Sequence, residues 1–311
     1  MSHNIWYTIF MKNLEQHLED YLDYLEIEKN RSLKTRDNYD RYLRAFFSFG
    51  NVRSLRGITA DLVRDFRLHL ARTTTVYGKP LKKNTQSYYI ISLRNFLKFL
   101  IKNGYHVLSP DIIELPRLST RQIDILEYTD LERLLDAPDI RDLRGLRDKS
   151  ILEMLFSTGL RISELCALDR YINFSNGEFT IRGKGEKLRI VFVSSRARDA
   201  LAHYLEKRTD TEKALFISLT RSGNVVGRIT PRAIQRLFRF YTTKAGIVDI
   251  RVTPHSLRHQ FATDLLANGA DLRSVQELLG HQNVTTTQIY THVTNKELKN
   301  IHQHFHGKRR N

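Results

Sequence analysis

The chain lacks several features that would define its class. Its single cysteine, Cys166, excludes an intramolecular disulfide, and the apolar spacing around it predicts a core residue. Internal repeats and low-complexity tracts are also missing. The apolar stretch from Ile5 to Met11 is too short to cross a membrane, and no basic segment precedes it. We therefore expect a cytoplasmic protein with no membrane partner.

Acidic residues are scarce relative to basic ones. Aspartate and glutamate number 34 against 50 lysines and arginines, which gives a formal net charge of +16 and a pI near 9.9. Both halves of the chain carry the excess. Such a charge favours a polyanionic partner, because neutralising phosphates releases counterions and steers association. A basic protein that binds no nucleic acid can have the same composition, so charge alone leaves both interpretations open.

The length of 311 residues exceeds the usual size of one hydrophobic core and predicts two domains. Residues 12–105 contain four segments with apolar residues at three- and four-residue spacing, which is typical of amphipathic helices. We expect a small helical domain there, preceded by an extension over residues 1–11. Residues 106–127 contain Pro110 and Pro116 and lack a helical period, which indicates an exposed linker.

Residues 128–311 are predicted to form a second domain in which strands interrupt the helices. Two strands are expected at Glu178–Arg182 and Lys187–Val193, with a glycine-containing hairpin turn between them. Helix starts are indicated by a capping box at Thr129–Glu132 and by capping residues at Thr230, Thr253, Asp271 and near Thr285. The predicted fold class is mainly α with a small antiparallel β-sheet, divided into a helical domain and an α+β domain.

Six polar residues of the second domain suit one kind of substrate. They are two arginines, a lysine, two histidines and a tyrosine: Arg161, Lys184, His255, Arg258, His281 and Tyr290. A phenol can act as a nucleophile, two guanidiniums match the non-bridging oxygens of a phosphate, and an ammonium can protonate an alkoxide leaving group. The set predicts chemistry on a phosphodiester and requires neither a metal nor a cofactor.

His255 and Arg258 are three residues apart in a helix that begins at Thr253, so we expect them on one face near the positive end of the helix dipole. Such a pair is also common on helices without a function. His255 and His259 have the spacing of a zinc-protease pair, but Ser256 stands where the catalytic glutamate would be, and no carboxylate completes the ligand set. We therefore expect no metal site.

The helical domain has two basic faces that are candidates for contact with DNA. The residues are Lys34, Arg36, Arg41 and Arg44 in the second helix and Lys82, Lys83, Arg94 and Lys98 around the fourth. A solvated polar face has the same pattern, so phosphate contact and simple solubility both remain open.

Five short segments of the second domain occur in a fixed order: Thr158–Leu165 (TGLRISEL), Gly183–Gly185 (GKG), His255–His259 (HSLRH), Leu279–His281 (LGH) and Tyr290–Val293 (YTHV). In order and spacing they resemble the active-site motifs of the tyrosine recombinases, and the compact length resembles the Xer-type members. The four-helix domain is similar to the family's core-binding domain by pattern alone. Two departures, the apolar extension to Met11 and Gln282 after His281, affect no catalytic position.

The resemblance implies a mechanism. Tyr290 would attack a DNA phosphate to give a 3′-phosphotyrosyl enzyme and a free 5′-hydroxyl, and strands would rejoin without ATP. Arg161 and Arg258 would hold the charged transition state, and His281 would donate a further hydrogen bond. His255 would be the general base and Lys184 the general acid. Glu164 would orient Arg161.

The resemblance also implies partners. These are double-stranded DNA with paired half-sites, three further protomers in a tetramer on two sites, either identical or from a paralogous recombinase, and a DNA translocase. A C-terminal helix at about 295–305 would dock on a neighbouring protomer, and the enzyme would associate with the nucleoid. Its task would be chromosome-dimer resolution or the integration of a mobile element. A type IB topoisomerase-like enzyme and a catalytically silent DNA-binding protein are the alternatives, and the target sequence stays open.

Overall fold

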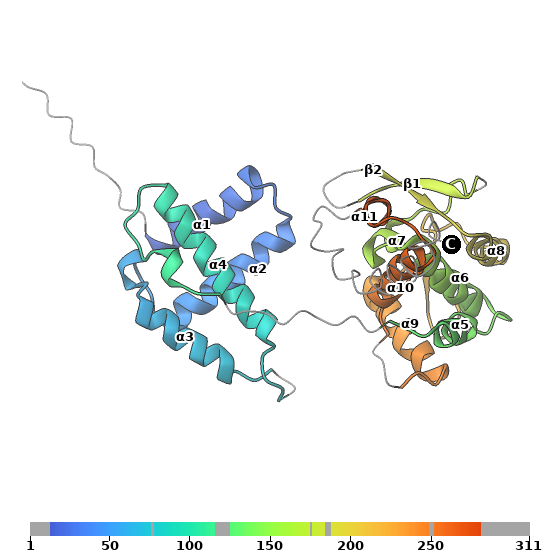
Figure 1. Ribbon diagram of the computed structural model, residues 1–311, viewed down its shortest axis with the longest axis horizontal. Coiled ribbons are helices and arrows are strands. Elements are labelled where there is room, and N and C mark those ends of the chain that lie inside the picture. The colour runs from blue at the N-terminus through green and yellow to red at the C-terminus, as the bar shows by residue number, and fades with distance from the viewer. Residues whose placement is uncertain are drawn as a thin grey trace, which may run out of the picture. The chain divides into compact units, whose positions relative to one another are not determined.

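The computed structural model describes residues 13–75, 78–115, 125–174, 176–183, 188–248 and 252–280 (Figure 1). The chain divides into two compact units, Met1–Thr120 and Arg121–Asn311, each with its own hydrophobic core. Helices predominate, and the strands form small antiparallel sheets. The predicted fold class is therefore confirmed.

The first unit consists of four helices and short helical turns. The helices are α1 (Leu14–Asp23), which continues as a π-turn (Tyr24–Glu28), α2 (Leu33–Phe49), α3 (Ala60–Arg72) and α4 (Lys83–Lys102), and 3₁₀ turns lie at Leu55–Gly57 and Pro110–Ile112. Asn13, Ser32 and Thr59 cap the first three helices, each accepting a hydrogen bond from an amide in the first turn. The core is aromatic: Tyr21 packs edge-on against Phe96, and Phe46 packs against Phe66.

The second unit contains seven helices and four strands among its described residues. The elements are α5 (Tyr128–Asp136), α6 (Leu143–Thr158), α7 (Ile162–Ala167), β1 (Glu178–Arg182), β2 (Leu188–Phe192), α8 (Ser195–Glu206), β3 (Ile217–Leu219), β4 (Val225–Arg228), α9 (Pro231–Lys244), α10 (Pro254–Ala267) and α11 (Leu272–Leu279). Two antiparallel hairpins, β1–β2 and β3–β4, form separate sheets. In Figure 1, α11 lies beside β2, close to the hairpin.

Two parts of this unit differ from the sequence-based expectation. The capping box predicted at Thr129–Glu132 is wrong: the N-cap is Glu127, so α5 begins two residues earlier, at Tyr128, and Glu132 instead accepts a 2.7 Å hydrogen bond from Arg196. Helix α8 was not predicted. The β3–β4 hairpin was not predicted either, because β3 and β4 are too short for an alternating strand pattern to be distinguished from a loop.

Helix α6 forms the centre of the second unit and packs against both α8 and α10. Its residues Ile151, Leu152, Met154 and Leu155 are fully buried, and burial of each such side chain stabilises the fold by about 1.5–3 kcal/mol. The helix ends at Gly159, which has a left-handed φ of +58°. Cys166 is buried and unpaired, which confirms its place in the core.

Candidate active site

The predicted catalytic set lies partly within the described residues. Arg161, Glu164, His255 and Arg258 are described, and they come from α7, α10 and the turn that precedes α7. The remaining predicted parts lie outside the described residues: Lys184, His281, Tyr290, the extension over residues 1–11 and the helix at about 295–305.

Arg161 occupies the N-cap position of α7 and is held by Glu164 one turn later. The Arg161 amide donates to Glu164 Oε2 at 2.8 Å, and the Arg161 guanidinium donates through Nη1 to Glu164 Oε1 at 2.7 Å. A third bond runs from Arg161 Nη2 to the carbonyl oxygen of Gly280 at 3.2 Å. The Arg161 side chain remains 26% exposed, so its guanidinium is oriented and still within reach of a ligand.

Arg258 directly follows the capped first turn of α10. Thr253 caps this helix by accepting from the Ser256 amide, Ser256 Oγ accepts from the Thr253 amide in return, and Pro254 occupies the first helical position. Arg258 is 4% exposed and donates to the carbonyl oxygens of Gly159 and, at 2.5 Å, of Leu279. The predicted start of this helix is confirmed.

The two guanidiniums meet at the carboxyl end of α11. Arg258 binds the carbonyl of Leu279 and Arg161 binds that of Gly280, so both occupy the negative end of this helix dipole, where cations are stabilised. Gly280 has a φ of +63°, and a Cβ there would lie 3.2 Å from the Arg189 side chain. The structure therefore unites three of the five sequence motifs around one helix end, immediately before His281.

Arg189 is a member of the site that the motifs did not reveal. From β2 it donates through Nη1 and Nη2 to the two carboxylate oxygens of Glu164, at 3.0 and 2.8 Å. Burial raises the pKa of Glu164, but hydrogen bonds from Arg189 and from the amide and guanidinium of Arg161 outweigh it and lower the pKa to about 2. The available signal was a charge at position 189, in phase with the buried Val191 of the same strand.

The two imidazoles of α10 are held in the neutral form. Partial burial lowers the pKa of His255, and the charges of Arg258 and Arg161 lower it further. Burial, the neighbouring His255 and Arg258 together lower the pKa of His259 to about 4. A neutral imidazole can accept a proton at physiological pH, which is what a general base requires.

The basic faces of the first unit divide into paired and unpaired side chains. Arg36 contacts Asp23 and Glu26, Arg44 contacts Glu15 and Asp40, and Arg94 lies 3.6 Å from Asp111. Arg41 is exposed and lies over the ring of Tyr42. The exposed lysines Lys34, Lys82, Lys83 and Lys98 have no carboxylate partner among the described residues.

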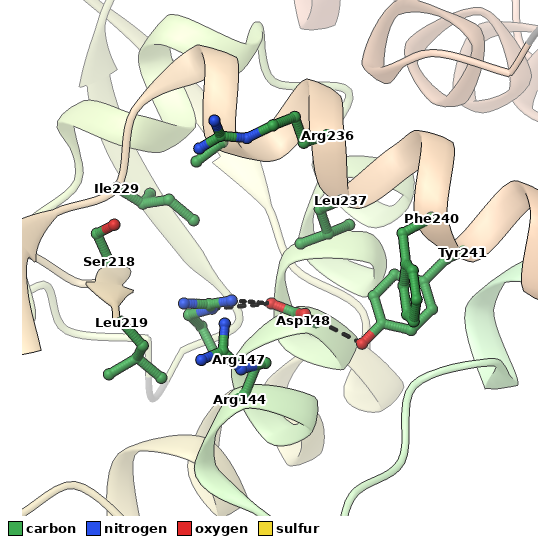
Figure 2. Close-up of a pocket in the computed structure, with 11 residues that line it drawn as sticks. Arg144, Arg147, Asp148, Ser218, Leu219, Ile229, Arg236, Leu237, Phe240 and Tyr241 are labelled. Carbon is green, nitrogen blue, oxygen red and sulfur yellow. Dashed lines mark hydrogen bonds and ion pairs between the residues drawn. The ribbon is translucent and has the colours of Figure 1, made fainter. Parts of the chain in front are cut away.

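A further basic surface, which the sequence patterns did not single out, lies on α9. Arg232, Arg236 and Arg239 follow one another at four- and three-residue spacing, are exposed, and are unpaired within the described part of the chain. Arg236 also borders a cavity of about 350 Å³ (Figure 2). Figure 2 shows Arg147 pointing to the buried Asp148, which also accepts a 3.0 Å hydrogen bond from Tyr241. These three side chains of the cavity wall are therefore hydrogen-bonded to one another. None of the four described site residues lines the cavity.

Two classes of feature are absent from the described residues. No helix among them is long and apolar enough to cross a membrane. Within the same ranges, no three histidine, cysteine or carboxylate side chains come together as a metal site would require.

Comparison with known proteins identifies the family of both units. Residues 124–297 match the family described as "Phage integrase family", and residues 18–104 match the one described as "Phage integrase, N-terminal SAM-like domain". The chain belongs to the phage integrase family of tyrosine recombinases.

Relatives of similar length indicate which group of tyrosine recombinases the chain resembles. The tyrosine recombinase XerC of Bacillus subtilis (strain 168) is 36% identical over 306 residues, covering 95% of this chain and 98% of the relative. The tyrosine recombinase XerD of Listeria monocytogenes serotype 4b (strain F2365) is 37% identical, covering 93% and 98%. These matches confirm the resemblance to the Xer-type site-specific recombinases.

Solved structures share the architecture. The crystal structure of XerA recombinase is 29% identical, covers 94% of this chain and 99% of its own, and superposes with a TM-score of 0.51. XerH bound to palindromic difH substrate, in a post-cleavage complex, is 24% identical with a TM-score of 0.67, covering 92% of this chain and 83% of its own. At that identity the XerH likeness supports the fold alone.

Proposed function

We propose that this recombinase cleaves DNA through Tyr290, giving a 3′-phosphotyrosyl linkage and a free 5′-hydroxyl. The observation that carries the proposal is the meeting of Arg161 and Arg258 at the end of α11, because two guanidiniums on one helix end form a site for a phosphate. Attack by the phenol places extra charge on the equatorial oxygens of phosphorus, and fixed cations stabilise that charge more than they stabilise the substrate.

The other roles follow from charge and protonation. His255, kept neutral by burial and by the two arginines, is the proposed general base for Tyr290. Lys184, at the β1–β2 hairpin, is the proposed acid for the 5′-oxygen that leaves, and His281 is a proposed hydrogen-bond donor to the phosphate. Glu164 positions Arg161. The reaction exchanges one phosphodiester for another of similar energy and needs no metal, cofactor or ATP.

Two basic surfaces are proposed to hold the duplex. In the first unit the stronger candidates are the basic side chains that contact no carboxylate of the described residues, because Arg36, Arg44 and Arg94 already face carboxylates. These side chains are Lys34, Arg41, Lys82, Lys83 and Lys98. In the second unit the basic surface on α9 presents three exposed guanidiniums, those of Arg232, Arg236 and Arg239, with no carboxylate partner in the described part of the chain. Binding of a polyanion at these two surfaces agrees with the positive net charge of +16.

The proposed working unit is a tetramer on two DNA sites with paired half-sites, made of one chain or of this chain and a paralogous recombinase. Docking of the C-terminal segment at about 295–305 on a neighbouring protomer would couple assembly to cleavage. Since the relatives are XerC and XerD enzymes, we propose chromosome-dimer resolution in the cytoplasm, at the nucleoid, with a DNA translocase as regulator. Integration of a mobile element uses the same chemistry and is the alternative.

The test is covalent capture on a suicide substrate that carries a nick next to the cleavage site. Loss of the short 5′-hydroxyl fragment prevents religation, so the wild-type enzyme should accumulate a protein–DNA adduct on denaturing gels. Tyr290→Phe should bind the same DNA and form no adduct. An adduct formed by Tyr290→Phe, or none formed by wild type on its mapped host site, would contradict the proposed nucleophile.

A further inference from the structure

Glu164 pairs with two arginines, Arg161 and Arg189, and this sharing sets the net charge of the group. A lone Arg161–Glu164 pair has no net charge and attracts a phosphate weakly. Arg189 adds a second cation to the same carboxylate, and the side chains of both Glu164 and Arg189 are nearly buried, at 8% and 10% exposure. The group of three therefore carries one net positive charge, in a place where water screens it little.

The hydrogen bonds to Glu164 leave one nitrogen of the Arg161 guanidinium, Nη2, directed at the end of α11. Oε1 of Glu164 accepts from Arg161 Nη1 at 2.7 Å and Arg189 Nη1 at 3.0 Å, while Oε2 accepts from the Arg161 amide at 2.8 Å and Arg189 Nη2 at 2.8 Å. Arg189 thus takes the bidentate position on the carboxylate. Arg161 uses only Nη1 there and donates through Nη2 to Gly280, at the helix end that both guanidiniums share.

Resting on the proposed function, we propose that Arg189 is a positioning residue of this site. It neutralises Glu164, so the charge of Arg161 remains available to the scissile phosphate. It also prevents Glu164 from forming a bidentate ion pair with the Arg161 guanidinium. Arg189 pairs with Ile181 across the β1–β2 hairpin, so the same side chain also ties the hairpin that carries Lys184 to the phosphate-binding arginines.

The experiment measures single-turnover adduct formation and DNA affinity for Arg189→Gln, Glu164→Gln and the double variant. Arg189→Gln should slow adduct formation by about 10- to 100-fold, the range expected for losing a charge-assisted contact that supports a transition-state charge, with DNA affinity within about twofold of wild type. In the Glu164→Gln background the same change should cost less than about threefold, because no carboxylate is left to neutralise.

Arg196→Gln is the matched control, because Arg196 also joins carboxylates, Glu132, Asp136 and the buried Glu153, but contacts none of the site residues. Its adduct rate should stay unchanged. An Arg189→Gln enzyme at the wild-type rate, or one with the same penalty in both Glu164 backgrounds, would overturn the inference. If Arg189→Gln does not fold, Arg189→Met, which also removes the charge, decides: slower adduct formation supports the inference and a wild-type rate refutes it. Failure of the wild-type enzyme to form an adduct would instead refute the proposed function.

Discussion

Gly159 connects the central helix α6 to the turn that holds Arg161, one of the two arginines proposed to bind the phosphate. Its φ of +58° suits glycine, its carbonyl accepts from Arg258, and a Cβ there would approach Phe261 Cδ1 to 2.5 Å. Gly159→Ala should lower the free energy of unfolding by about 2–4 kcal/mol, since left-handed strain and overpacking add. It should also slow cleavage, because the turn that leads to Arg161 must shift.

Gly269 provides the matched control for this substitution. It also follows a helix and has a φ of +90°, but no atom lies within 4 Å of a Cβ built there. Gly269→Ala should cost only the backbone strain, about 1 kcal/mol, and leave the cleavage rate unchanged. Equal losses for the two variants in chemical denaturation would show that Phe261 does not restrict position 159.

Glu164 makes stability depend on pH in a defined window. Its pKa of about 2 in the folded state lies below its ordinary value of 4.5, so the unfolded chain binds more protons as the pH falls between these values. The stabilisation, up to about 3 kcal/mol, is present above pH 4.5 and is lost on acidification toward pH 2. Urea denaturation at several pH values should show a shallower acid decline for Glu164→Gln, and identical slopes would contradict it.

Among the elements, α10 carries His255 and Arg258 within its first five residues, so its N-terminal cap affects both. Thr253→Val removes the side-chain acceptor at the N-cap and should cost about 1 kcal/mol of stability. It should also lower the cleavage rate by more than the unfolded fraction explains. Thr253→Ser should restore both quantities.

Helix α9 offers the control, because it starts in the same way, with Thr230 accepting from the Ala233 amide and Pro231 at the first helical position. Thr230→Val should show the same stability loss with no change in the cleavage rate of the bound complex. A comparable loss of rate for both variants would mean that capping affects cleavage only through stability.

The elements also show what the sequence could and could not predict. Apolar spacing and N-cap residues predicted the four helices of the first unit and the starts of α9, α10 and α11, because these signals are local. The motif order predicted that Arg161 and Arg258 would come together. Arg189 was not predicted, since its contact with Glu164 depends on a hairpin register and spans 25 residues.

For the whole molecule, the salt dependence of DNA affinity should come more from arginines and lysines without a described carboxylate partner than from those in ion pairs. Each phosphate contact adds about 0.9 to the slope of log affinity against log salt, so replacing Arg232, Arg236 and Arg239 together by glutamine should reduce the slope by about 2.7. The control triple of carboxylate-paired residues Arg133, Arg141 and Arg196 should leave it nearly unchanged. Fluorescence anisotropy at several salt concentrations distinguishes the two, and equal slopes would exclude α9 from the DNA surface.

The most direct measurement asks whether the buried guanidinium of Arg258 acts on the charge of the scissile phosphate. Arg258→Ala should bind DNA normally and cleave a phosphodiester about 10²- to 10³-fold more slowly than wild type. A methylphosphonate at the scissile position removes one negative oxygen, so the gap between Arg258→Ala and wild type should shrink to less than about tenfold. If the gap is equally large on the charged and the neutral linkage, Arg258 does not stabilise phosphate charge.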